Sequence, residues 1–564
     1  MQVSSRWRRA AVLPVVAAFA LTATAAYAAT AVDAQANNPQ VAGDPTSNTT
    51  ARFPTNKANE TTIAVNPTNS RYLVAGANDE QRQPPCGPGP VRGPSASQSD
   101  CSFFNNVGTS GVYTSADGGL TWTNRGLLDD QASWAASPFV SDGDPVLAYG
   151  PKPDTSVASG FSYAHGARVY YATLASYRDN AGPYPANKAP EYNAVSYSDD
   201  NGATWSTPVL SSTKDNPNNF NDKEWLAVDD DADSPHFGNV YVSWTSFRSA
   251  SSGNEPVFVT RSTDGGRSFD SGNQLSPAGN NGTGNGRQGS YVITGPDGSV
   301  YVAFEQAGAQ VVAISRDGGV SYTRPITIGA VSDIDDPIPG ANFRTDSFPT
   351  IADDPRDGSS TLYASWANKT PAGGRIVVST STDKGRSWST PVAVTSAAEG
   401  YSFFQGMDVA DNGRVDLGYQ ALVAVNPAIF GTGNAAISSW YVSKPAGGAW
   451  TAPTKVSSVS SDPAAGAQNN LARQFWGDYN QLVSTDARAW YIYTDSRGGV
   501  GCPAVDAYQK YLRDNGLARG DMPDRIATRL GQPRAADPSV KPAPPLACPA
   551  QFGNTDAYVS AITP

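Results

Sequence analysis

Apolar and polar residues alternate with a period of two along most of this chain, in short runs bounded by glycine, asparagine and aspartate. Such runs are typical of β-strands. Seven of them resemble one another and begin, at a mean spacing of about 70 residues, at Tyr72, Val169, Val240, Val300, Leu362, Val415 and Trp490. Each follows a candidate first strand: TTIAVN, PVLAYG, EWLAVD, SYVITG, FPTIAD, GMDVAD or YNQLVS. The spacing leaves room for four strands and their loops in every repeat.

A second pattern, Ser-x-Asp-x-Gly-x-(Thr/Ser)-aromatic, recurs with fixed internal spacing. Its five intact copies begin at Ser115, Ser198, Ser262, Ser315 and Ser381, and a degenerate sixth begins at Ser443. Serine and aspartate can cap backbone N–H groups in a turn, while glycine accepts positive φ and the aromatic residue packs beneath. The pattern therefore predicts a series of tight hairpins.

This motif is the Asp box, or BNR repeat, and the chain resembles the sialidase-like β-propeller superfamily from the first box to the C-terminus. The resemblance implies that each box lies between the third and fourth strands of a blade, away from the active site. With seven second strands, we predict an all-β fold, a single seven-bladed β-propeller of four-stranded blades with Asp-box turns. A six-bladed sialidase propeller is the alternative.

The predicted domain organisation has three parts: a signal peptide over 1–28, an N-terminal segment over 29–58, and the propeller over 59–564. The third strand of the last blade would be 557–563, where the sequence ends. Its fourth strand must then come from the N-terminal segment, and Gln40-Val41-Ala42 is the candidate. Closure of this kind removes the sheet edges.

The first 28 residues have the character of a secretory leader. Three arginines precede an apolar run over 10–25, and Ala26-Tyr27-Ala28 offers a cleavage site. No later run reaches the roughly 20 apolar residues that a membrane-spanning helix needs. We therefore expect a secreted, extracellular monomer. A formal charge of −11 and an isoelectric point near 4.8 argue against nucleic acid or an anionic membrane as partner.

Four cysteines, Cys86, Cys101, Cys502 and Cys548, fit two disulfides in an oxidising compartment. Three pairings exist, and Cys86–Cys101 with Cys502–Cys548 is favoured because each pair brackets one proline-rich insertion. The second insertion, over 502–550, contains a predicted helix at 505–512. The two histidines, His165 and His236, offer little for a zinc site or a Ser-His-Asp triad.

Polar side chains stand at or just before the starts of the first strands, where a propeller brings them to the mouth of its channel. They include Asn59-Glu60, Asp144, Asp222-Lys223-Glu224, Arg287, Arg344, Asp346 and Asp478-Tyr479. Arg287, Arg344 and Arg473 precede the first strands of blades four, five and seven. If they converged, they would clamp a carboxylate, as a sialidase clamps its substrate acid. Asp346 and Asp478 are further substrate-binding candidates.

The resemblance also implies a tyrosine nucleophile with a glutamate partner and an aspartate acid/base. By position, these are Tyr479, Glu224 and Asp144. No cofactor is expected, although the acidic runs 229–233 and 333–336 raise the alternative of structural Ca²⁺. Neither run has EF-hand spacing, so solvated turns are favoured for both.

Three functions follow from these patterns. The first is a glycoside hydrolase of the exo-α-sialidase type that acts on an acidic-sugar glycan or glycoconjugate. The second is a non-catalytic propeller that binds glycans or proteins, favoured by the seven blades and by Asn59-Glu60-Thr61 where sialidases carry Phe/Tyr-Arg-Ile-Pro. The third is a polysaccharide lyase, for which His165 is the candidate base.

Overall fold

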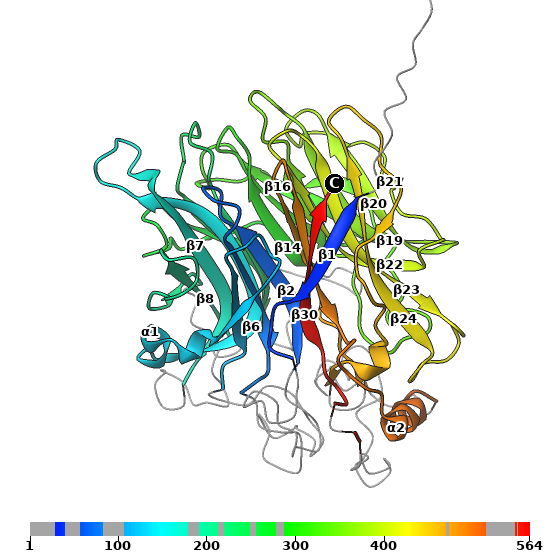
Figure 1. Cartoon of the computed structure of the whole chain (residues 1–564). Coiled ribbons are helices and arrows are strands. Elements are labelled where there is room, and N and C mark those ends of the chain that lie inside the picture. The colour runs from blue at the N-terminus through cyan, green and yellow to red at the C-terminus, as the bar shows by residue number, and fades with distance from the viewer. Residues whose placement is uncertain are drawn as a thin grey trace, which may run out of the picture.

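Seven four-stranded antiparallel sheets form a closed ring, so the chain is a seven-bladed β-propeller and the six-bladed alternative is wrong (Figure 1). The computed structural model describes residues 29–39, 57–82, 107–178, 191–212, 219–248, 255–277, 287–469, 473–514, 548–549 and 551–564. The predicted leader and the Cys86–Cys101 pair lie outside these residues. All seven predicted first and second strands overlap observed strands.

The first four blades each use four consecutive strands. Blade one contains β2 (Ala58–Val65), β3 (Leu73–Asp79), β4 (Ser110–Ser115) and β5 (Thr123–Leu127). Blade two contains β6 (Phe139–Pro153), β7 (Phe161–Tyr177), β8 (Tyr192–Ser198) and β9 (Val209–Leu210). Blade three contains β10 (Asn219–Val228), β11 (Val240–Arg248), β12 (Val257–Ser262) and β13 (Asn273–Gln274). Blade four contains β14 (Arg287–Thr294), β15 (Val300–Gln306), β16 (Ala309–Ser315) and β17 (Ile326–Ala330).

Blades five and six repeat this plan, and blade seven combines both ends of the described chain. Blade five contains β18 (Thr350–Asp353), β19 (Leu362–Thr370), β20 (Gly373–Ser381) and β21 (Val392–Ala393). Blade six contains β22 (Tyr401–Val409), β23 (Val415–Ala424), β24 (Ala435–Lys444) and β25 (Thr454–Lys455). Blade seven contains β28 (Gln481–Ser484), β29 (Ala489–Asp495), β30 (Asp556–Thr563) and β1 (Thr30–Gln35).

The described helices are short and lie outside the sheets. They are α1 (Ala132–Ala135), α2 (Pro503–Asp514) and the 3₁₀ turns η1 (Leu128–Asp130) and η3 (Pro463–Ala465). A small hairpin pairs β26 (Gln468–Asn469) with β27 (Arg473–Gln474). The predicted helix at 505–512 is confirmed as α2, and so is the Cys502–Cys548 disulfide beside it. In Figure 1, α1 and α2 lie at the same lower end of the ring.

The five intact Ser-x-Asp-x-Gly sequences form hairpin turns with the same hydrogen bonds. In the first, the Gly119 N–H donates to Ser115 Oγ at 2.9 Å, and the N–H and hydroxyl of Thr121 donate to Asp117 at 3.0 and 2.6 Å. The other four repeat these contacts. This turn joins β4 to β5, the third and fourth strands of its blade, as predicted.

The ring is closed by the N-terminal strand β1, which pairs antiparallel with β30 from Thr30↔Thr563 to Gln35↔Tyr558. Closure by the N-terminal segment was predicted, but its assignment to 40–42 was wrong: β1 fills the position, and 40–42 lies outside the described residues. The reason is that every residue of β1 has a partner on β30. Figure 1 shows the first and last strands side by side.

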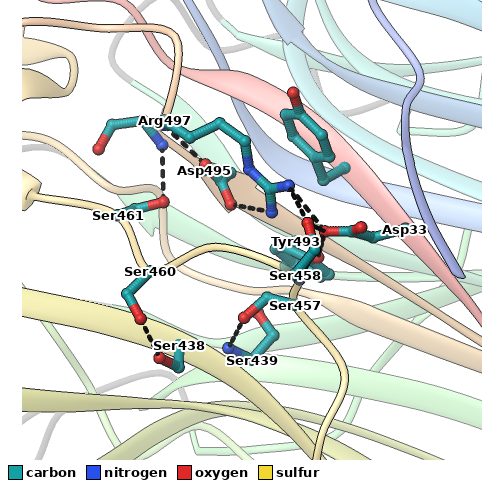
Figure 2. Close-up of polar contacts among 12 residues, drawn as sticks. Asp33, Ser438, Ser439, Ser457, Ser458, Ser460, Ser461, Tyr493, Asp495 and Arg497 are labelled. Carbon is teal, nitrogen blue, oxygen red and sulfur yellow. Dashed lines mark hydrogen bonds and ion pairs between the residues drawn. The ribbon is translucent and has the colours of Figure 1, made fainter. Parts of the chain in front are cut away.

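Three largely buried charged side chains, Asp33, Asp495 and Arg497, together with the exposed Ser458 after β25, form what we call the closing cluster, which fixes β1 to blades six and seven (Figure 2). Arg497 contacts Asp33 of β1 and Asp495 of β29, both at 2.8 Å. The Ser458 N–H and hydroxyl also donate to Asp33, each at 3.0 Å. The three charged side chains are 3–13% exposed, so solvent screens their attraction weakly.

Among the described residues, no helix has the length and apolar character needed to cross a membrane.

The carboxyl groups of the ring predict a stability maximum in mildly acidic solution. Hydrogen bonds from Ser387 hold the pKa of the Asp-box residue Asp383 at about 2, so its stabilising contribution is lost as the pH falls from 4 towards 2. Burial instead raises the pKa of several carboxyls, which release protons more readily when unfolded, so stability falls as the pH rises from 4 to 7. They include Asp79, at about 6, and Asp229, Asp408 and Asp556, at about 7. We expect the melting temperature to peak near pH 4 and to fall by several degrees by pH 8, as measured by differential scanning fluorimetry. A melting temperature that rises from pH 5 to pH 8 would contradict this assignment.

Candidate functional site

The first strands of five blades carry a β-bulge at an equivalent position, and the bulged residue has positive φ. These residues are Glu60 (φ 53°), Asp144 (φ 50°), Lys223 (φ 58°), Gly289 (φ 70°) and Phe404 (φ 47°). For an L-residue with a side chain, the left-handed region costs roughly 1–2 kcal/mol. Four side chains held in this conformation indicate that the strained backbone has a function.

The equivalent positions in blades five and seven are Phe348 and Tyr479, each two residues before the first paired residue of its strand. Lys223 Nζ of blade three lies 3.3 Å from the centroid of the Tyr479 ring of blade seven. These two blades are not neighbours in the ring, so the bulged positions meet at the axis. A pocket of about 390 Å³, which includes solvent-open space at its mouth, is lined by five of the seven: Lys223, Gly289, Phe348, Phe404 and Tyr479.

One side of the axis is acidic. Asp144 lies within hydrogen-bonding reach of the carboxyl groups of Glu60 and Asp222, and we call these three residues the acidic triad. Asp144 and Asp222 are half-buried, whereas Glu60 is 2% exposed and lies beneath them. The Asn78 amide donates to Glu60 at 2.5 Å, and the Gln288 amide donates to Asp222 at 3.0 Å. These two neutral amides thus orient Glu60 and Asp222, the two members that flank Asp144.

Two members of the acidic triad have raised pKa values. Burial and the charges of Asp144 and Asp478 raise the pKa of Glu60 well above its usual range, while the nearby Arg344 opposes this effect. The same three causes raise the pKa of Asp222. A raised pKa favours the protonated form of a carboxyl, so Glu60 and Asp222 are candidates for general acid catalysis beside Asp144.

Two cationic side chains face the triad. Arg344 binds Asp478 in a bidentate pair, at 2.8 and 2.7 Å, and lies 3.8 Å from Glu60. Its side chain is 37% exposed, so it stands at the outer rim of the site. Lys223 is buried, and burial lowers its pKa against the attraction of the surrounding carboxylates.

The pocket beside the acidic triad is lined largely by aromatic rings. The Trp225 and Tyr291 rings stack with centroids 4.0 Å apart, and Trp225 meets the Tyr479 ring edge-on at 5.7 Å. Phe348 and Phe404 complete this wall. A ligand with apolar C–H faces and hydroxyl edges, such as a sugar, would meet these rings and the carboxyl groups of Asp346 and Asp478, which also line the pocket.

The three nominated catalytic residues lie in this region but do not form the expected chain of contacts. The Tyr479 hydroxyl donates to the Pro145 carbonyl at 3.0 Å, and burial raises its pKa well above the usual range. Both carboxyl oxygens of Glu224 are buried without a hydrogen-bond partner from another residue, so Glu224 is not bonded to Tyr479. Asp144 is central, as the middle member of the acidic triad.

The nominated arginines have different carboxylate neighbours. Arg344 binds Asp478, and Arg473 binds Asp336 at 2.7 Å. Burial lowers the pKa of Arg287, and the charge of Glu255 opposes this effect. The structure therefore brings Arg344 to the mouth of the pocket and does not gather the three arginines around one group. Asp346 and Asp478 both line the pocket.

Sequence reasoning did not single out Glu60, Asp222 or Lys223 from the other polar residues at the strand starts. A usable signal for Glu60 and Lys223 was their position along the strand. Like Asp144, each stands two residues before the first residue that is paired beyond the bulge. His165, the candidate base of a lyase, is exposed beside Asp154 near the β6–β7 turn, at the end of the ribbon away from Asp144.

No family model matches the sequence, and no curated protein sequence matches it. Similar solved structures include the Hadza microbial sialidase Hz136, which is 13% identical with a TM-score of 0.35 over 69% of this chain and 70% of that one. The NanB sialidase of Streptococcus pneumoniae is 11% identical with a TM-score of 0.34, over 61% of this chain and 64% of that one. A polysaccharide lyase described as an ulvan lyase is 12% identical with a TM-score of 0.34, over 58% and 78%. Likeness at this level carries no argument about activity.

Proposed function

We propose that the protein is a glycoside hydrolase that acts on a glycan bound in the axial pocket. The observation that carries the proposal is the acidic triad, in which Asp144 lies within hydrogen-bonding reach of two carboxyls of raised pKa. Glycoside hydrolysis needs one carboxyl group that keeps a proton for the departing oxygen, and a second that stabilises the positive charge on the sugar.

The two half-buried members of the triad supply these roles. Asp222, held by Gln288, donates its proton to the glycosidic oxygen as the bond to the sugar carbon breaks. A water molecule forms the new bond to that carbon and gives its proton to Asp144. Asp144 stabilises the developing oxocarbenium charge, and Glu60 acts as a positioning residue because it contacts Asp144 from beneath. The aromatic wall binds the sugar ring, and Lys223 limits the negative charge of the pocket.

The substrate class that we propose is an acidic-sugar glycan, with an exo-α-sialidase as the first activity to test. Arg344 supports this choice, because it stands at the rim with 37% of its side chain exposed. To bind a substrate carboxylate it would exchange part of its contact with Asp478. The predicted leader and the disulfide support action outside the cell, as a monomer, on a glycoconjugate.

A panel of fluorogenic glycosides, acidic and neutral, tests this proposal. We expect turnover of an acidic glycoside, and we expect Arg344→Ala to raise KM for it by about tenfold while changing KM for a neutral analogue less than threefold. The exposed Arg267→Ala variant is the matched control. Glycan-array binding without turnover would instead establish the non-catalytic propeller. An unsaturated uronate product, lost in His165→Ala, would establish the lyase.

A further inference from the structure

A second group of carboxylates lies beside the pocket and takes no part in the acidic triad. Glu305 stands near the end of β15, while Asp333 and Asp346 belong to the connection between β17 and β18. One carboxylate oxygen from each lies within 4.8 Å of the other two. We call these three residues the connection cluster. Asp346 also lines the axial pocket, and Asp333 is exposed, so the cluster reaches from solvent to the pocket wall.

Other aspartates of the same connection are matched by cations of the protein. Asp335 pairs with Lys369, and Asp336 pairs with Arg473 at 2.7 Å. In the part of the chain that the structure describes, no lysine or arginine side chain forms an ion pair with Glu305, Asp333 or Asp346. Three close carboxylates without a counter-charge repel one another at a cost that a bound cation would remove.

The side chain of Gln310 gives independent evidence for a cation. Gln310 lies directly opposite Glu305 in the β15–β16 pair, so both side chains point to the same face. Its amide nitrogen donates to the Ser347 carbonyl at 2.6 Å, and the Ser347 N–H donates to Asp346 at 2.7 Å. This holds the amide beside Ser347, the residue that follows Asp346, and identifies its other atom as oxygen.

That oxygen is buried without a hydrogen-bond partner, in a side chain that is 0% exposed, and Glu305 Oε2 is also buried and unpartnered. A buried acceptor without a donor costs about 1–3 kcal/mol. An acceptor that faces carboxylates can be satisfied by a cation, and a fourth oxygen of this kind completes one side of a coordination sphere.

We propose that Glu305, Asp333, Asp346 and the Gln310 amide oxygen bind a Ca²⁺ ion. The donors are all oxygens, as a hard cation requires. The three carboxylate oxygens lie within 4.8 Å of one another, so a single ion with bonds of about 2.4 Å can contact them all. Ca²⁺ is favoured over Mg²⁺ because Mg²⁺ usually keeps several waters and is seldom held by a set of protein oxygens alone. The ion would tie the connection, which carries Arg344 and Phe348 to the pocket, to the β15–β16 hairpin.

Calorimetric titration of the full-length, EGTA-treated protein with CaCl₂, without substrate, tests the site. We expect one Ca²⁺ per chain and a melting temperature several degrees higher at saturation. The double variant Glu305→Gln/Asp333→Asn should bind Ca²⁺ at least tenfold more weakly, while Asp231→Asn should bind as the wild type does. Asp231 is the matched control, because it belongs to the other acidic run and caps its own turn by accepting from the Asp233 N–H.

Ca²⁺ density between the three carboxylates in wild-type crystals would support the proposal even if the double variant failed to fold. No binding by the wild type at about 10 mM Ca²⁺ would overturn it, since even weak extracellular sites bind in the range of 10⁻⁴–10⁻³ M. Unchanged binding by a folded double variant, or tighter binding of Mg²⁺ than of Ca²⁺, would also overturn it. These outcomes are independent of glycoside turnover.

Discussion

Asp144→Asn is expected to lower kcat/KM on the glycoside identified by the panel by about 10²- to 10⁴-fold, the usual contribution of acid–base groups. The substitution removes the charge that is proposed to stabilise the sugar cation. It also removes one cause of the raised pKa values of Glu60 and Asp222. Asparagine tolerates the left-handed backbone at this position (φ 50°), so the fold should be retained.

The pH profile of the residual activity provides the sharper measurement. Asp222 is active when protonated, and a lower pKa makes it lose its proton at lower pH, so the alkaline limb of the profile should move towards acid. Asp411→Asn, on an exposed turn of blade six, is the control and should leave both limbs unchanged. Turnover within threefold of wild type by Asp144→Asn, with an unmoved profile, would refute the role given to the triad.

Tyr479→Phe separates this mechanism from one with a tyrosine nucleophile. We expect a loss of less than tenfold, because the hydroxyl donates to the Pro145 carbonyl and the ring, which contacts Lys223 and Trp225, is retained. Loss of activity as complete as that in Asp144→Asn would instead favour the nucleophilic role predicted for Tyr479 from the sequence.

Arg497→Met is expected to destabilise the ring by about 3–5 kcal/mol, the usual cost of removing one partner from a buried ion pair. Arg497 is the cation between Asp33 and Asp495, whose side chains are 8% and 3% exposed, and both carboxyl groups would lose their cationic partner in the variant (Figure 2). Urea unfolding would measure the loss, and hydrogen exchange should show faster opening of β1 than of the other strands.

Arg267→Met is the control for the stability experiment, because Arg267 is an exposed Asp-box residue whose guanidinium bonds only weakly, at 3.3 Å, to the Asp264 carbonyl. It should change the free energy of unfolding by less than about 0.5 kcal/mol. If Arg497→Met were no more destabilising than this variant, the closing cluster would have no part in holding β1.

Most of the fold was predictable because its signals are local. Alternation located the first two strands of every blade, and the Ser-x-Asp-x-Gly spacing located five turns, since each turn makes its own hydrogen bonds within seven residues. The closing strand was not predictable in the same way. The segments 30–35 and 40–42 both read as short strands, and the choice between them depends on pairing with β30, more than 500 residues away.

The site was predictable as a region and not as a set of contacts. The polar residues at the strand starts indicated a site at the axis of the ring. Which side chains contact one another there depends on the angular position of each blade. Asp144 meets Glu60 and Asp222 of the two adjoining blades, whereas Arg473 is taken by Asp336. The left-handed bulges were hidden for a different reason: glutamate, lysine and phenylalanine, as at Glu60, Lys223 and Phe404, give no sequence signal for a conformation that they seldom adopt.

The pairing of β1 with β30 constrains the order in which the molecule assembles. Residues 30–35 are synthesised first, yet their partner strand, 556–563, emerges only after the other six blades. Loop-closure entropy makes such a distant pairing late and slow. Until then β1 and one edge of β30 are exposed to other chains. Refolding at low protein concentration should therefore give monomers. Refolding at high protein concentration should give dimers that exchange strands at the β1–β30 pairing.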